Sequence, residues 1–391
     1  MALYDVENSK TAKLKKAYVV GANQTTEKLK KAYVVNAEKK LEKLWSGFTP
    51  MFVSATRTRL FHSEDGKKWE VQDIPWDTTY NSSSSKQPTM GITYGLGKYW
   101  LAHGKYLCSS EDGITWTIDK ISDSPSPYKS FGFHNAFFVN NQIVVYERVN
   151  VTSFNTTYTL HVTSDGVNWS TIDLGQPSFS LIKDMVYGTY KGNNVYFWMC
   201  MEGERGTLYT SATLDGPRTL ITTRYSGGSG SDCYYAQMVI PNANKNILVG
   251  LDKNSSGSYT NFQLDLTTGY YTMGVLNYNS SYPHMLLCAT NSELLAYQYS
   301  SGFRYKKLDG SASGNYSTGT QYVSSGQYVM HPPHNESGLV SFVMDNSSKE
   351  CVCAIYKADG ASAFTKVTNV ADLESDNLFV SAYSTDGGGW S

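Results

Sequence analysis

One short motif, Asp-Gly-x-x-Trp, occurs four times along this chain of 391 residues. Its copies start at Asp65, Asp112, Asp165 and Asp386, each just after a run of residues with β-strand character. Aspartate accepts hydrogen bonds from backbone N–H groups in a turn, and glycine adopts the left-handed conformation that bulkier residues resist. The tryptophan ring can then pack between neighbouring sheets. The motif therefore predicts a series of similar hairpins, which is typical of a repeat architecture.

The motif resembles the Asp-box of sialidases and of many other β-propellers. In that family the box is structural, so the resemblance implies that these aspartates belong to the scaffold and not to a catalytic centre. The serine or threonine before each aspartate can cap the same turn. The residues assigned to structural boxes are Ser63, Asp65, Gly66, Trp69, Ser110, Asp112, Gly113, Trp116, Asp165, Gly166, Trp169, Asp386, Gly387 and Trp390.

The repeating unit is clearest around the second copy of the motif. Four short β-type runs occur there, at residues 91–94, 98–102, 106–109 and 115–118, and they predict one blade of four antiparallel strands. Asp65, Asp112, Asp165 and Asp215 are 47, 53 and 50 residues apart. Residues 48–391 divide into seven units of about 49 residues, so we predict an all-β, seven-bladed β-propeller, with six or eight blades as alternatives.

The last copy of the motif falls out of this period. Asp386 follows Asp359, in the decayed seventh unit, by only 27 residues, and the first unit is also short. Both irregularities have one explanation if the β-type run at residues 378–383 pairs with the first blade. Such pairing closes the ring and removes an exposed sheet edge, which is otherwise an aggregation hazard.

Residues 1–47 have a repeat of their own. The segment at 13–20, Lys-Leu-Lys-Lys-Ala-Tyr-Val-Val, recurs identically at 28–35, and an eroded third copy lies at 40–45. Alternating apolar residues predict short strands for the first two copies, whereas residues 37–45 fit a helix equally well. So small a segment cannot bury much surface alone, so we expect it to dock on a partner or on copies of itself.

Tandem Lys-Lys-Ala-Tyr-Val units that end in Trp45-Ser46-Gly47 resemble the N-terminal arms of tail and baseplate appendage proteins. Those proteins belong to phages and prophages of Gram-positive bacteria. The turns here depart from the Gly-Val-Asn-Gly pattern that is commoner in such arms. The resemblance implies a protein of the virion tail whose residues 1–47 bind other tail or baseplate proteins. Attachment through so short an arm also suggests a homo-oligomer, and the scattered cysteines suggest synthesis in the reducing cytoplasm of the bacterial host. The arm residues assigned to attachment are Tyr18, Tyr33 and Trp45.

Charge and composition exclude several classes. The net charge is −1, so no global field favours nucleic acid or a membrane surface. Residues 1–47 hold ten lysines against five acids, which fits a solvated or protein-docking surface better than a nucleic-acid grip. We expect no signal peptide, no membrane span and no cofactor. The six scattered cysteines predict buried thiols without metal spacing, and His331-Pro-Pro-His334 fits a rigid turn better than a metal site.

The sequence favours binding over catalysis. Sialidases need three arginines, an Arg-Ile-Pro motif and a Tyr/Glu pair, but none of the seven arginines here lies in that motif. Glu202 and Glu204 read as solvated acids near a turn. Tyrosine and tryptophan on polar loops suit recognition of a host-surface glycan or protein. The candidate receptor-binding residues are Trp76, Tyr80, Tyr234, Tyr235, Tyr278 and Tyr282.

The expected function is therefore non-catalytic, multivalent adhesion of a phage particle to its host. The main alternative is a glycoside hydrolase on the same scaffold, which would need two carboxylates across a sugar. A third possibility is a structural virion component that never touches the host.

Overall fold

In a computed structural model of the chain, most of the described residues lie in β-strands. The described residues are 18–20, 26–28, 31–35, 41–46, 51–56, 58–64, 70–77, 90–122, 132–150, 156–175, 177–179, 181–202, 205–225, 238–240, 245–253, 259–273, 287–289, 293–298, 302–307, 313–315, 328–329, 334–335, 338–345, 350–357, 362–367 and 380–383. Side-chain surroundings are described only between residues 51 and 272. The chain divides into two compact units, Met1–Pro50 and Met51–Ser391.

The described residues of the first unit form two antiparallel pairs of strands. In one, β1 (Tyr18–Val20) pairs with β2 (Thr26–Lys28), and in the other, β3 (Lys31–Val35) pairs with β4 (Leu41–Ser46). The helix considered for residues 37–45 is wrong, because β4 runs along β3 with a bulge between Ala32 and Tyr33. Pairing with β3 satisfies the backbone of this segment, whereas an isolated helix of nine residues is marginal in water.

The second unit is built from antiparallel sheets, and three of them follow one another between residues 90 and 225. The first contains β8 (Met90–Gly95), β9 (Lys98–His103), β10 (Tyr106–Ser110) and β11 (Thr117–Ile121). The second contains β12 (Gly132–Val139), β13 (Gln142–Asn150), β14 (Thr156–Thr163) and β15 (Ser170–Gly175). The third contains β16 (Leu181–Tyr190), β17 (Asn193–Glu202), β18 (Arg205–Ser211) and β19 (Thr219–Tyr225).

Three further sheets follow along the chain. One contains β20 (Met238–Val239), β21 (Ile247–Lys253), β22 (Tyr259–Asp265) and β23 (Tyr271–Met273). The next contains β24 (Leu287–Ala289), β25 (Glu293–Gln298), β26 (Gly302–Lys307) and β27 (Ser313–Asn315). The third contains β28 (Tyr328–Val329), β29 (His334–Asn335), β30 (Gly338–Asp345), β31 (Glu350–Lys357) and β32 (Ser362–Val367).

One more sheet combines strands from both ends of the second unit. It contains β5 (Phe52–Ala55), β6 (Arg59–Ser63), β7 (Glu70–Asp73) and, from far along the chain, β33 (Val380–Tyr383). β33 runs antiparallel to β5, with Val380 opposite Ala55 and Tyr383 opposite Phe52.

The prediction of an all-β chain with antiparallel sheets is confirmed for the described residues, which contain no helix. The four runs predicted around the second motif correspond to β8, β9, β10 and β11. No helix in the described part of the chain is long and apolar enough to cross a membrane.

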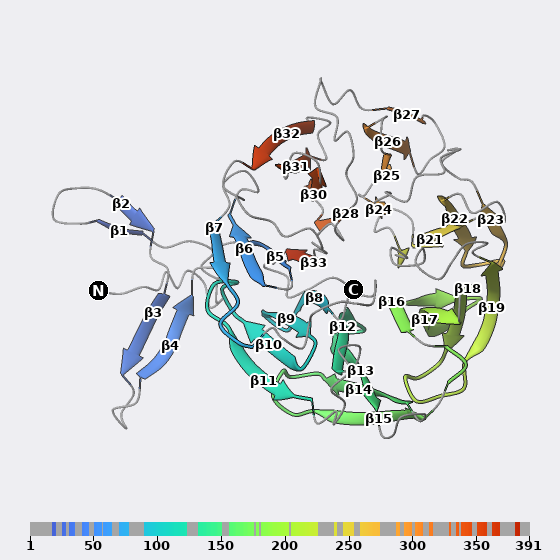
Figure 1. The fold of residues 1–391 in the computed structure, drawn as a ribbon, viewed down its shortest axis with the longest axis horizontal. Helices are drawn as coiled ribbons and strands as arrows, with labels where there is room; N and C mark the ends of the chain where they lie inside the picture. Colours follow the sequence, from blue (N-terminus) through green and yellow to red (C-terminus); the bar gives the residue numbers. More distant parts are fainter. Residues whose placement is uncertain are drawn as a thin grey trace, which may run out of the picture. The chain divides into compact units, whose positions relative to one another are not determined.

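Neighbouring sheets contact each other through their first strands. β8 contacts β12, β12 contacts β16, β16 contacts β20 and β20 contacts β24, while β33 lies against β8. In Figure 1, β8, β12 and β16 lie innermost and β11, β15 and β19 outermost in their sheets. This arrangement leaves the faces of the sheets to pack on one another, as in propeller-like folds.

Between residues 51 and 272, where side chains are described, the hydrophobic core forms separate layers between successive sheets. Trp100 and Leu107 of the β8–β11 sheet pack against Phe133 of the next sheet. Tyr146 in turn packs in a cluster with Trp198, and both are fully buried. Because each layer is filled by large aromatic side chains, the apolar surface that it buries fixes the sheets to one another.

Hydrogen bonds also link the first strands of neighbouring sheets at two junctions. Asn135 on β12 follows a β-bulge, and its side chain donates to the Lys183 carbonyl on β16 at 3.0 Å. Asp184 on β16 follows a corresponding bulge, and it accepts from Met238 N–H on β20 at 2.6 Å. Bulges re-aim side chains, and here they turn an Asx residue toward a neighbouring backbone.

Candidate functional site

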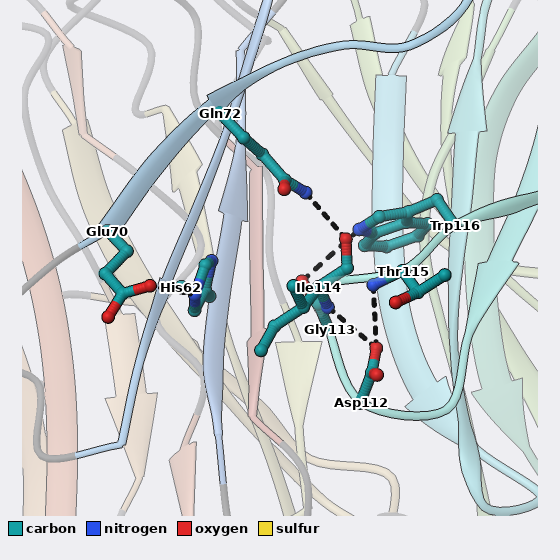
Figure 2. A network of polar contacts seen from close by, with 8 residues as sticks. All are labelled: His62, Glu70, Gln72, Asp112, Gly113, Ile114, Thr115 and Trp116. Atoms are coloured by element: carbon teal, nitrogen blue, oxygen red, sulfur yellow. Dashed lines mark hydrogen bonds and ion pairs between the residues drawn. The ribbon is translucent and has the colours of Figure 1, made fainter.

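The turn between β10 and β11 shows how the repeated motif is built. Asp112 Oδ1 accepts hydrogen bonds from the backbone N–H groups of Ile114 and Thr115, at 2.9 and 2.8 Å. Ser110 Oγ accepts from Gly113 N–H at 2.8 Å and lies 3.1 Å from Asp112 Oδ1. Figure 2 shows this carboxylate directed at its own turn. Its described contacts are those of a turn scaffold.

The turn between β14 and β15 repeats the arrangement. Asp165 Oδ1 accepts from the N–H groups of Val167 and Asn168, both at 2.8 Å, and the Asn168 side chain donates to Oδ2 at 2.7 Å. These bonds, the Val167 backbone first, lower the pKa of the Asp165 carboxyl. Thr163, two residues before the aspartate, takes the place of Ser110 and accepts from Gly166 N–H at 2.9 Å. The sequence predicted that a serine or threonine before the aspartate caps the turn, without saying which one.

Both turns also contact the preceding sheet. A Cβ on Gly113 would lie 2.4 Å from Val53 on β5, and one on Gly166 would lie 3.2 Å from Trp100 on β9. The indole of Trp169 packs edge-on against Trp100, with ring centroids 5.4 Å apart. The turns are therefore contacts between sheets as well as hairpin ends.

Figure 2 shows a second link at the first of these junctions. Gln72 on β7 donates through Nε2 to the Ile114 carbonyl at 2.8 Å, which ties the turn to the preceding sheet. Trp116 donates to the Gly113 carbonyl at 3.3 Å and packs against Trp76.

Two later turns, between β18 and β19 and between β22 and β23, lack the full motif but keep part of this arrangement. Asp265 Oδ1 accepts from the N–H groups of Thr267 and Thr268, which lowers the pKa of its carboxyl, the Thr268 backbone bond being the main cause. At Asp215 the turn is closed instead by a 3.4 Å bond from Gly216 N–H to the Thr213 carbonyl. Of the remaining motif residues, Ser63 is buried at the end of β6. The residues of the first and last copies that lie outside the described part are Asp65, Gly66, Trp69, Asp386, Gly387 and Trp390.

Replacement of Asp112 by alanine should lower the free energy of unfolding by about 1–2 kcal/mol, since two backbone N–H groups lose their acceptor. Asp112→Asn keeps an oxygen acceptor at the same position, so it should lose much less. Urea unfolding followed by tryptophan fluorescence measures both. Equal losses for the two variants would contradict this role of Oδ1.

Trp76 requires a correction. The composition of its loop predicts a receptor-binding residue, but Trp76 is only 8% exposed and packs with Ala55 and Leu60 between two sheets. Its Nε1–H donates to His103 Nδ1 at 3.1 Å, and His103 Nε2 lies 3.1 Å from the Thr56 carbonyl, so the imidazole bridges both groups as its neutral Nε2–H tautomer. Loop composition had suggested exposure, whereas the ring fills a gap in the core.

The other candidate residues lie where the structure gives no side-chain surroundings. Tyr80, Tyr234, Tyr235, Tyr278 and Tyr282 are outside the described residues. The arm residues Tyr18, Tyr33 and Trp45 lie on β1, β3 and β4, with only their backbone described. The described side chains include no group of three or more His, Cys, Asp or Glu residues that could hold a metal. Of the cysteines, Cys108 and Cys200 are buried free thiols, and burial raises the pKa of both.

A buried polar cluster that the sequence did not predict lies between β11 and the next sheet. Glu147 on β13 accepts from Ser122 Oγ, and its other oxygen lies 2.6 Å from His161 Nε2 on β14. In a serine nucleophile relay, the imidazole bonds to the hydroxyl. Here the carboxylate stands between the serine and the histidine, so the order of the groups is that of a structural bridge.

A second cluster with a similar layout lies one sheet further on. It also contains a serine and a glutamate, but a tyrosine takes the place of the histidine. Glu202 at the end of β17 accepts through Oε1 from Tyr209 O–H on β18 and from Ser178 Oγ, the latter at 2.6 Å. Burial, and then the bond to Glu202, raise the pKa of the Tyr209 phenol. The sequence reading of Glu202 as a merely solvated acid is wrong. No local signal marks the site, because its three residues come from separate segments.

Tyr209 and Glu202 form a hydrogen-bonded tyrosine–glutamate pair. Sialidases also need three arginines beside such a pair. The nearby guanidinium of Arg218 lies over the rings of Phe179 and Trp198, 5.2 and 5.4 Å from their centroids, and makes no described ion pair with Glu202.

No protein-family model and no curated protein matches this sequence. Among solved structures, the chain is similar to puromycin hydrolase as an S511A mutant complexed with PGG, at a TM-score of 0.55 and 10% identity over 84% of this chain and 53% of that one. A second puromycin hydrolase structure has a TM-score of 0.50 and 12% identity, over 83% of this chain and 55% of that one. TolB from Acinetobacter baumannii has a TM-score of 0.44 and 10% identity, over 86% of this chain and 83% of that one. The chain spans little more than half the length of the two hydrolase structures, and at these identities the similarity concerns the propeller-like fold alone.

Proposed function

We propose that this protein is a receptor-binding appendage of a phage virion tail. The Met1–Pro50 unit attaches it to other tail or baseplate proteins, and the second unit adheres to a glycan or protein of the host cell surface without catalysis. The observation that carries this proposal is the division into two units, together with the two short antiparallel strand pairs that the repeated segment forms in the described part of the first unit. Isolated two-stranded hairpins are marginally stable in water, which favours docking on partners or on other copies.

We also propose that the second unit is a seven-bladed propeller closed by its C-terminal strand. Seven sheets of four or five strands among the described residues support this count. The pairing of β33 with β5 supports closure, since it joins the far end of the chain to its first sheet. A closed ring provides a rigid head without a free sheet edge.

Adhesion is supported over hydrolysis by what the described carboxylates do. Asp112 and Asp165 are engaged by their own turns, and Glu147 is 5% exposed with both oxygens bonded. A glycoside hydrolase needs two carboxyl groups on either side of a scissile bond. Glu202, with one oxygen bonded to two hydroxyls, is the position at which such an activity is most usefully tested.

Deletion of residues 1–50 should abolish incorporation into particles while leaving cell binding intact, because the second unit has its own core. The full chain and the truncated chain can be compared by particle incorporation, by binding of labelled protein to whole host cells and by thermal unfolding. Binding should also fall after enzymatic removal of wall glycan if the receptor is a carbohydrate.

Two outcomes would contradict the proposal. A truncated chain that is folded but binds no cells would favour a structural virion component. Release of reducing sugar from purified host wall, lost in Glu202→Gln, would favour the glycoside hydrolase.

A further inference from the structure

We propose that Ser178, Glu202 and Tyr209 form a binding site for a saccharide without anionic groups, which presents hydroxyl or amine donors to Glu202. The inference rests on the proposed adhesive function and specifies the chemistry of its ligand. We call these three residues the Glu202 cluster.

The Glu202 cluster is assembled by the fold from three segments. Ser178 lies in the connection from β15 to β16, Glu202 ends β17, and Tyr209 lies on the adjacent β18. The Ser178 and Tyr209 hydroxyls both donate to Glu202 Oε1. Because two donors from different segments converge on one oxygen, the orientation of the carboxylate is fixed before any ligand arrives.

The second carboxylate oxygen of Glu202 has no bonding partner among the described residues. No described residue donates to Glu202 Oε2, and no described lysine or arginine forms an ion pair with this carboxylate. Ser178 is exposed, and Glu202 and Tyr209 are partly exposed, so a ligand can reach the cluster from solvent. A carboxylate held in place with one free, accessible oxygen is suited to accept a hydrogen bond from a ligand.

The preceding sheet junction provides an internal comparison. There too a serine after the fourth strand and a side chain on the third strand, Ser122 and His161, bond to a glutamate on the second strand. That glutamate, Glu147, is buried, and each of its oxygens has a protein partner. The two junctions share one layout, but only the Glu202 cluster leaves an oxygen unused at the surface.

The cluster offers acceptors and no spare donors. The Ser178 and Tyr209 protons are directed at Glu202, and the raised pKa of Tyr209 keeps its phenol protonated at neutral pH. Only lone pairs therefore remain for a ligand. The ligand must supply donors, as sugar hydroxyl and amine groups do, and an anionic saccharide would be repelled by the carboxylate.

Aromatic side chains complete the surroundings. The Tyr209 ring is partly exposed and is backed by buried Phe179, with centroids 6.4 Å apart. Aromatic rings beside a few fixed polar groups are the usual composition of small-ligand sites. The C–H face of a sugar ring can pack on the tyrosine while its hydroxyls reach Glu202.

Glu202→Gln should weaken binding of a glucosamine tetramer and of a glucose tetramer to the full chain by about tenfold or more, because a charge-assisted hydrogen bond is lost. Isothermal titration calorimetry with these two tetramers and a galacturonate tetramer measures the effect. Wild type should bind the galacturonate tetramer most weakly, and Glu202→Gln should narrow that gap. A merely structural defect would weaken all three ligands in parallel.

Glu111→Gln, the same substitution at an exposed position in the β10–β11 turn, serves as the control and should change none of the affinities. Tyr209→Phe keeps the ring but removes one donor to Glu202, so a smaller loss is expected. Unchanged tetramer affinities in Glu202→Gln, or no tetramer binding by wild type, would overturn the site. If whole-cell binding persists in that case, only the Glu202 site is refuted and the adhesive function is retained. If wild type binds neither the tetramers nor whole cells, both the site and the adhesive function are refuted.

Discussion

Gly113→Val should destabilise the second unit by about 3–5 kcal/mol, as the sum of a strained backbone and an overpacked contact. Gly113 has a φ of 77°, in the left-handed region that β-branched residues resist. A Cβ there would also lie 2.4 Å from Val53 on β5, in the preceding sheet. Urea unfolding followed by tryptophan fluorescence should show a lower midpoint, and Gly113→Ala should show a smaller decrease.

Gly97→Ala separates the two causes. Gly97 has nearly the same φ, 78°, but a Cβ there would meet no atom within 4 Å. Gly97→Ala should therefore lower the free energy of unfolding only through backbone strain, by about 1–2 kcal/mol. If Gly97→Ala and Gly113→Ala are equally destabilising, the contact between the turn and the preceding sheet contributes nothing. A clear excess for Gly113→Ala measures that contact directly.

This comparison bears on what the repeated motif is for. Its aspartate stabilises a hairpin locally, while its glycine and tryptophan contact the neighbouring sheet. A turn that served only its own hairpin would tolerate a side chain on the glycine wherever φ allowed. The motif therefore links local turn chemistry to the packing of successive sheets.

The fold was largely predictable because its signals are local and repeated. Alternating residues and turn signals located β8, β9, β10 and β11 to within two or three residues. The strand at the end of the chain was predicted from a break in the period, and β33 pairs with β5. Hairpins depend on neighbouring residues, so one sequence window contains most of the information that specifies them.

The candidate site was much less predictable, because it depends on residues that only the tertiary structure brings together. Trp76 was placed on a binding surface from the composition of its loop, yet its ring lies in the core. Glu202 was dismissed as solvated, yet two hydroxyls from other segments fix its carboxylate. Burial and side-chain convergence across sheets leave no spacing rule in the sequence.

The bulges of the inner strands are a further feature without a sequence signal. Asn135 and Asp184 occupy corresponding positions, but the first donates to a carbonyl and the second accepts from an N–H group. Asparagine satisfies its contact as a neutral group. Aspartate at the same kind of position brings a titratable group into the interior, with consequences for stability that depend on pH.

The free energy of unfolding should fall as the pH rises from about 4 to about 7, owing to Asp184. Burial raises the pKa of this carboxyl from 3.8 to about 7, although the N–H groups of Met238 and Met185 oppose the shift. Between these values the native state holds a proton that the unfolded state has released, so stability decreases by about 1.4 kcal/mol per pH unit. The total loss in the free energy of unfolding is on the order of 4 kcal/mol and is complete above pH 7.

Asp184→Asn isolates this contribution, because the difference in unfolding free energy between variant and wild type cancels the other titrating groups. The variant should be less stable than wild type at pH 4.5, because its amide nitrogen must face one of the two N–H groups, of Met185 or Met238, that donate to Asp184. It should gain on wild type as the pH rises to 7.5. Asp165→Asn is the control: its carboxyl has a lowered pKa, so above about pH 5 that group is ionised in both states and adds no slope. Parallel pH profiles for wild type and Asp184→Asn would mean that the carboxyl is ionised in the folded protein and that its two N–H partners suffice to stabilise the charge.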